Sequence, residues 1–128
     1  MNNSRIIYLA DDDPDDRFLI KEAINEIHNR IIFIEAENGL ELLDSIENLT
    51  DPSKALILLD MNMPMMNGIE AITAIRNNPR FSGVEAIMIS TSSDPSLAER
   101  AFKAGVNSYF TKPDTYEGFI NLAKQLKA

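Results

Sequence analysis

Cysteine is absent from the sequence, and this absence excludes disulfide frameworks, thiolate nucleophiles and cysteine-based zinc sites together. Long apolar runs are absent too: the longest, residues 6–10 and 55–59, have five residues each, far fewer than a membrane span requires. The first residues have neither the apolar core nor the small-residue cleavage site of a secretory signal. We therefore expect a cytoplasmic protein with no membrane segment.

Positive charge is scarce as well, because 12 Lys and Arg residues face 20 Asp and Glu residues, for a net charge of −8. This balance would repel a phosphate backbone or an anionic lipid surface, so we expect no direct nucleic-acid binding and no membrane association. With 128 residues, of which 45% are hydrophobic, the chain has the size and composition of one globular domain, residues 1–128. The acids are unevenly distributed and crowd into residues 11–16.

Short apolar segments alternate with amphipathic segments along the chain. The expected strands are residues 5–10, 31–36, 55–60, 84–90 and 108–111. Apolar residues at helical spacing mark five intervening helices, in residues 14–27, 42–49, 69–75, 97–102 and 116–123. Most strand segments are continuous apolar runs, typical of strands covered on both faces, and the short, more polar fifth strand is expected at an edge. This alternation predicts an α/β protein with a doubly wound parallel sheet, which binds ligands beyond the carboxyl ends of its strands.

Residues suited to chemistry stand at four of these strand ends. Asp11 and Asp12 follow the first strand, Asp60 ends the third, Ser90 ends the fourth, and Lys112 follows the fifth. If the first and third strands are neighbours, three carboxylates converge, and they repel one another unless a cation intervenes. Oxygen-only ligands of this kind suit Mg²⁺. A carboxylate between a divalent cation and an ammonium group is suited to accept a phosphoryl group, because both cations neutralise the incoming oxygens.

Other polar or unusual residues have simpler interpretations. Asp13, Asp15 and Asp16 are expected to be the cap and first-turn acids of the helix that follows, where the helix dipole favours them. The methionines of segment 61–66 lack the histidine or cysteine that a copper site would need. His28, the one histidine, is expected to contact last-turn carbonyls of a helix rather than a substrate.

Four segments in this order, ADDDPDD, LILLDMNMPMMNG, IMISTSSD and YFTKP, resemble the receiver domain of two-component response regulators. The resemblance covers essentially the whole chain. It implies a flavodoxin-like sheet of strand order 2-1-3-4-5 with five helices. It also implies that Asp60 accepts a phosphoryl group, with Mg²⁺, from a sensor histidine kinase or a histidine phosphotransfer protein. The chain would then be a signalling domain and not an enzyme, and its DPDDR opening resembles small receivers found beside phytochrome-type kinases.

The resemblance also implies a role for each ligand of the metal. Asp12 and Asp60 would supply side-chain oxygens to Mg²⁺, Asn62 would supply its backbone carbonyl, and Asp11 would act mainly through a bound water. Three consecutive aspartates leave the register of the acidic pair open, and the two nearest the strand fit the family best. Asn62 and Ser92 would flank the phosphoryl group and tune its lifetime.

Beyond the metal, Ser90 and Lys112 would contact the phosphoryl group, and Ser90 with Tyr109 would form the switch. Gly68 fits the turn before the third helix, and Pro113 would follow a cis peptide bond. The face formed by the fourth helix, fifth strand and fifth helix would bind a downstream target protein or a second copy of the chain.

Three alternative functions differ from this interpretation. Phosphatases of the haloacid-dehalogenase type also form an aspartyl-phosphate after a strand, but they need a second Asp two residues on, where this chain has Asn62. A phosphorylation-independent interaction module would typically lack one of the acids or the lysine, and none is missing. A receiver cut from a larger DNA-binding regulator would look the same, although the end of the chain just after its last helix favours a stand-alone receiver.

Overall fold

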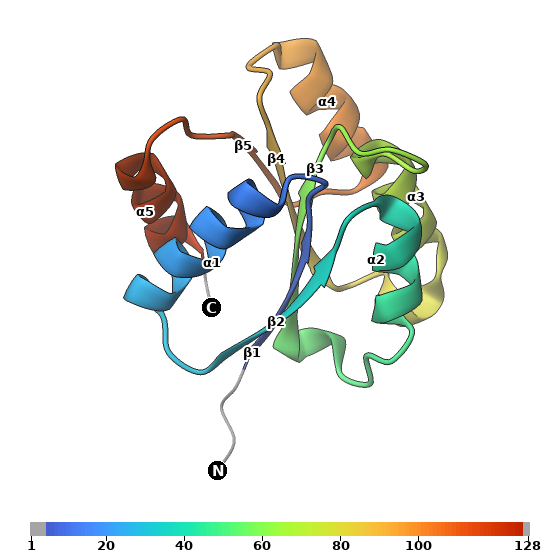
Figure 1. Cartoon of the computed structure of the whole chain (residues 1–128). Helices are drawn as coiled ribbons and strands as arrows, with labels where there is room; N and C mark the ends of the chain where they lie inside the picture. Colours follow the sequence, from blue (N-terminus) through green and yellow to red (C-terminus); the bar gives the residue numbers. More distant parts are fainter. Residues whose placement is uncertain (1–4, 127–128) are drawn as a thin grey trace.

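The computed structural model describes residues 5–126 and has a five-stranded parallel sheet at its centre (Figure 1). The strand order is β2–β1–β3–β4–β5, as predicted. The strands are β1 (Arg5–Ala10), β2 (Ile31–Ala36), β3 (Ala55–Asp60), β4 (Glu85–Ser90) and β5 (Ser108–Thr111). Four of the five agree with the predicted ranges, and β4 begins one residue later than expected.

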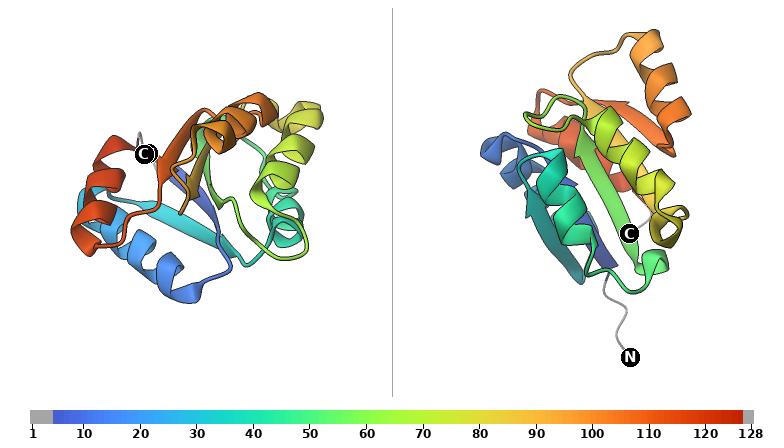
Figure 2. Two further views of the ribbon diagram at one scale, coloured as in Figure 1. Left: turned by 90° about the horizontal axis from the view of Figure 1, so that it is seen from above. Right: turned by 90° about the vertical axis from the view of Figure 1, so that its right-hand side faces the viewer.

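Helices cover both faces of the sheet, as parallel strands joined by crossover helices require. They are α1 (Pro14–Ile27), α2 (Gly39–Ile46), α3 (Gly68–Asn77), α4 (Pro95–Ala104) and α5 (Tyr116–Gln125). The views of Figure 2 place α1 and α5 together on one face and α2, α3 and α4 on the other. Two short 3₁₀ turns, Pro52–Lys54 and Pro79–Phe81, precede β3 and β4. No helix within residues 5–126 is both long enough and apolar enough to cross a membrane.

Helix ends follow local sequence chemistry. Asp13 caps α1, where its carboxylate accepts a hydrogen bond from the Asp15 N–H at 2.9 Å, and Asp94 caps α4 in the same way. A proline follows each of these caps, at the first helical position, where its missing N–H is not needed. Gly105 ends α4 with φ of 126°, a conformation that side chains disfavour.

The core consists of two apolar layers, one on each face of the sheet. Successive residues of β3 point to opposite faces, so Ile57 packs against the α2–α3–α4 layer and Leu58 against the α1–α5 layer. All six residues of β3 are buried. Burying one such aliphatic side chain contributes roughly 1.5–3 kcal/mol, so this central strand is firmly held.

One edge strand, β2, is less covered than its continuous apolar run indicates. β5 and β2 lie at the two edges, as the predicted strand order requires, and Ile32 of β2 is 50% exposed. A continuous apolar run therefore did not distinguish β2 from a central strand.

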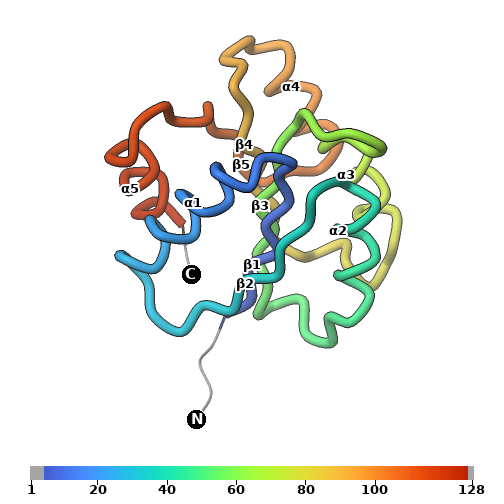
Figure 3. The backbone as a smooth tube through the Cα atoms, viewed as in Figure 1, coloured from blue at the N-terminus to red at the C-terminus, as the bar shows by residue number. Residues whose placement is uncertain are grey.

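The first and last helices lie side by side, as the tube trace in Figure 3 makes visible. His28, just after α1, places its Nε2 atom 2.8 Å from the Ala123 carbonyl oxygen of α5. The Tyr116 hydroxyl of α5 donates to the Glu26 carboxylate of α1 at 3.1 Å. His28 thus contacts a last-turn carbonyl, as expected, and the carbonyl belongs to the neighbouring helix.

Candidate functional site

The register of the sheet brings the four chemically distinctive strand ends to one edge. Ala10 pairs with Leu59, so the next residue of the β1 strand end, Asp11, is level with Asp60. The register of β3, β4 and β5 then carries Ser90 and Lys112 to positions just beyond Asp60. Convergence of these residues is a consequence of parallel pairing and needs no special loop.

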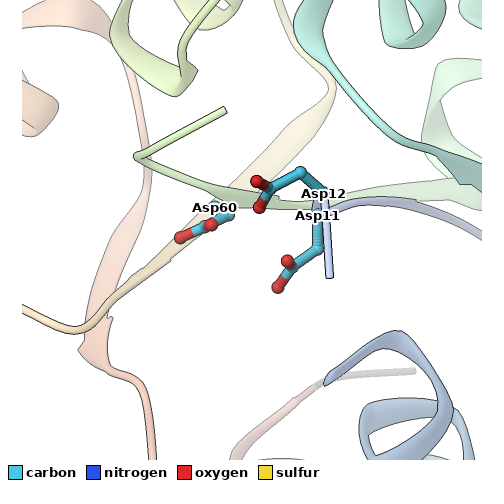
Figure 4. A group of neighbouring side chains, drawn as sticks. All are labelled: Asp11, Asp12 and Asp60. Carbon is cyan, nitrogen blue, oxygen red and sulfur yellow. The ribbon is translucent and has the colours of Figure 1, made fainter. Parts of the chain in front are cut away.

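Asp11, Asp12 and Asp60 form a compact acidic group, drawn in Figure 4. Each contributes a carboxylate oxygen, and these oxygens lie within 4.8 Å of one another. Asp11 and Asp60 are buried, whereas Asp12 is exposed to solvent. Hard oxygen ligands that are open to water on one side fit Mg²⁺, which binds through one or two carboxylates and keeps several waters. The donor set therefore fits the metal that the sequence predicts.

Lys112 is buried against this acidic group, with its side chain only 9% exposed. Its Nζ atom donates to Asp11 Oδ2 at 2.9 Å and also to Asp16 Oδ2 at 2.9 Å. Asp60 Oδ2 lies farther away, at 3.7 Å. The ammonium group thus stands between the predicted acidic group and a fourth carboxylate from α1.

Asp16 is the residue of this site that the sequence interpretation missed. It was expected to be a first-turn acid like Asp13 and Asp15, yet its carboxylate pairs with Lys112. A signal was available, because Asp16 stands four residues before Ile20, which is buried on the inner face of α1. Residues four apart share a helix face, so Asp16 lies on the side of α1 that faces the sheet and is only partly exposed to solvent.

Burial and charge perturb the acids of this site. Burial raises the pKa of Asp60 to about 6, with help from the negative charges of Asp11 and Asp12, while Lys112 and a hydrogen bond from the Asn62 N–H oppose the rise. Burial likewise raises the pKa of Asp11. Burial acts to lower the pKa of Lys112, but its bonds to the carboxylates raise that pKa overall. The site thus holds more negative charge than its one ammonium balances.

Ser90 and Tyr109, the predicted switch residues, both contact Ser92. Ser90 is fully buried, and its hydroxyl oxygen accepts a hydrogen bond from the Ser92 N–H at 3.1 Å. The Tyr109 hydroxyl donates to the Ser92 carbonyl oxygen at 2.8 Å. The loop between β4 and α4 therefore connects the buried hydroxyl to the ring on β5.

Two residues expected to have structural roles have different outcomes. A Cβ atom on Gly68 would lie 2.5 Å from the Asp60 backbone oxygen, so the close approach of α3 to the site does require glycine. The expectation of a cis bond before Pro113 is wrong, because no peptide bond within residues 5–126 is cis. The trans isomer is the intrinsically favoured one even before proline, and the Lys112 ammonium reaches Asp11 with the bond in that form.

Comparison with known proteins identifies the family. A model described as "Response regulator receiver domain" matches residues 7–124. The chain belongs to this family. It is a family of signalling receiver domains and not of classical enzymes.

Individual receivers agree with this assignment. Chemotaxis protein CheY1 of Helicobacter pylori is 32% identical over 109 residues, which cover 85% of this chain and 86% of the relative. The phosphorylated cyanobacterial phytochrome response regulator RcpA is 25% identical, with a TM-score of 0.84 over 94% of this chain and 89% of its own. The Mn²⁺-bound form of response regulator Rcp1 has the same fold, with 22% identity and a TM-score of 0.80 over 94% of this chain and 89% of its own.

Proposed function

We propose that this receiver, a single domain over residues 1–128, accepts a phosphoryl group on Asp60 from a phosphohistidine of a sensor histidine kinase or a histidine phosphotransfer protein. The observation that carries the proposal is the buried Asp60 carboxylate, which lies close to the carboxylates of Asp11 and Asp12 and 3.7 Å from the Lys112 ammonium. None of the acids or the lysine that phosphorylation needs is missing, which argues against a phosphorylation-independent module.

In the proposed transfer, an oxygen of Asp60 attacks the phosphorus atom, an O–P bond forms, and the N–P bond to the donor histidine breaks. The histidine nitrogen keeps the electron pair of that bond. Lys112 neutralises the phosphoryl oxygens, and the Ser90 hydroxyl donates a hydrogen bond to one of them. Asp11, Asp12, Asp60 and the Asn62 backbone carbonyl would hold Mg²⁺, which adds positive charge beside the phosphoryl group when bound.

We further propose that phosphorylation changes the face formed by α4, β5 and α5, and that this face binds a downstream protein or a second copy of the chain. The support is the path from Ser90 through Ser92 to the Tyr109 hydroxyl. If the Ser90 hydroxyl turns toward a phosphoryl oxygen, its bond to the Ser92 N–H breaks. The loop and the ring that depend on Ser92 then have a second arrangement to adopt, which the phosphoryl group favours by differential contact.

Intact mass after incubation with acetyl phosphate and Mg²⁺ tests the phosphoacceptor. We expect a gain of one phosphoryl group in the parent, and no gain in Asp60→Asn or after the metal is chelated. Asp15→Asn, which removes an exposed acid from α1, is the matched control and should still gain the group. A gain that persists in Asp60→Asn, or that needs no metal, would contradict the assignment.

A further inference from the structure

The Lys112 ammonium has three N–H donors, and the two carboxylates of Asp11 and Asp16 occupy two of them at 2.9 Å each. The third donor is left for the side on which Asp60 lies, 3.7 Å away. That distance is too long for a hydrogen bond to Asp60. The ammonium group is therefore close to the candidate nucleophile without being bonded to it.

Asp16 is held firmly where it meets Lys112. It lies in the first turn of α1, where the helix dipole favours an acid. The next residue, Arg17, ties the same turn to the strand end, because its guanidinium group donates to the Asp11 backbone oxygen and to the Glu35 carboxylate. With its side chain 25% exposed, Asp16 forms a partly buried ion pair, which solvent screens less than a surface pair.

We infer that Asp16 is a positioning residue that holds the Lys112 ammonium off Asp60 while keeping its third donor available for a phosphoryl oxygen. This inference rests on the proposed function. Without the Asp16 carboxylate, the released donor has Asp60 Oδ2, at 3.7 Å, as a neighbouring acceptor. The present ion pair at 3.7 Å would then shorten to a hydrogen bond, which would occupy the oxygen that has to attack phosphorus.

Phosphorylation rates with acetyl phosphate and saturating Mg²⁺ give the first test. Asp16→Ala should slow the reaction by about tenfold, the order expected for the loss of one hydrogen bond between charged groups. Asp16→Asn should fall between Asp16→Ala and the parent, since its amide oxygen still accepts from the ammonium group. Asp15→Ala is the matched control, because it removes an exposed acid of the same helical turn, and it should react at the parent rate.

A spectroscopic test separates positioning from general damage to the fold. In ¹⁵N-lysine spectra without phosphodonor, the Lys112 ammonium signal should shift in Asp16→Ala and Asp16→Asn and stay unchanged in Asp15→Ala. Parent-like rates in folded Asp16→Ala and Asp16→Asn would overturn the inference. If the parent itself takes up no phosphoryl group, the proposed function fails, and the Lys112 signal then tests the positioning role of Asp16 by itself. In that case an unchanged Lys112 signal in Asp16→Asn would overturn the positioning role.

Discussion

Replacing Asp60 by asparagine tests the electrostatics of the site directly, because it removes one buried negative charge with almost no change of shape. Asp60 shares its end of the sheet with Asp11 and Asp12, and burial together with their charges raises its pKa to about 6. The asparagine amide can also donate a hydrogen bond to a neighbouring carboxylate. We therefore expect Asp60→Asn to stabilise the metal-free protein at neutral pH.

The magnitude follows from the change in proton affinity on folding. The rise in the pKa of Asp60 from 3.8 to about 6 corresponds to about 3 kcal/mol of unfolding free energy lost once the group is ionised in both states. At a pH between these two pKa values, Asp60 is protonated in the folded protein and ionised in the unfolded chain. Raising the pH through this range therefore destabilises the fold. The extra unfolding free energy of Asp60→Asn over the parent should be absent below about pH 4, grow up to about pH 6 and stay constant at higher pH.

Urea unfolding of parent and variant across this pH range, without divalent metal, measures the effect. Asp15→Asn should show no such pH-dependent gain, because Asp15 is exposed in the first turn of α1. Adding Mg²⁺ should stabilise the parent more than Asp60→Asn, because a ligand that binds the folded state stabilises that state by mass action. The difference in unfolding free energy between the two proteins should therefore become smaller. A difference between parent and Asp60→Asn that does not vary with pH would refute the electrostatic reasoning.

Three other variants probe the metal, the packing and the switch. Asp12→Ala should weaken Mg²⁺ binding in a calorimetric titration by more than about tenfold, because losing even a residue that only hydrogen-bonds a metal ligand has an effect of that size. Asp13→Ala should change Mg²⁺ binding little, and equal losses of affinity in the two variants would mean that the acidic register is wrong. Gly68→Ala should destabilise the protein by roughly 1–3 kcal/mol in urea unfolding because its Cβ would clash with the Asp60 backbone, and Gly83→Ala, with nothing within 4 Å of its Cβ, should be close to neutral. Ser90→Ala should still accept a phosphoryl group yet show smaller amide shifts across residues 94–126 on addition of a phosphoryl mimic, and shifts as large as those of the parent would exclude Ser90 as the coupling residue.

Most of the fold was predictable because its signals are local. Apolar runs, proline after an aspartate cap and Gly105 each act within a few residues, and the strands and helices follow them closely. Edge position is not local: the resemblance to receiver domains implied it for β2 through the strand order, whereas the apolar run alone did not indicate that Ile32 is exposed. Whether a strand has one neighbour or two depends on the pairing of the whole sheet, and an apolar run does not indicate the number of neighbours.

The site was predictable to the extent that strand ends determine it. Asp11, Asp12, Asp60 and Lys112 converge because parallel register requires it. Asp16 was not predicted as part of the site because its role depends on how α1 packs against the end of β5, and a first-turn acid has a sufficient local explanation.

The acidic group cannot relieve its repulsion by moving apart, because the strands that carry it are fixed on both sides. β3 is buried along its whole length and pairs with β1 and β4, so separating Asp60 from Asp11 would break ladder hydrogen bonds and expose the core. A proton, an ammonium group or a metal ion must therefore supply the balancing charge. Lys112 supplies part of it, but Asp16 shares that ammonium, so the site stays short of positive charge. The same rigidity that makes the three acids unfavourable for stability keeps their oxygens together, where we propose that a cation and a phosphoryl group bind.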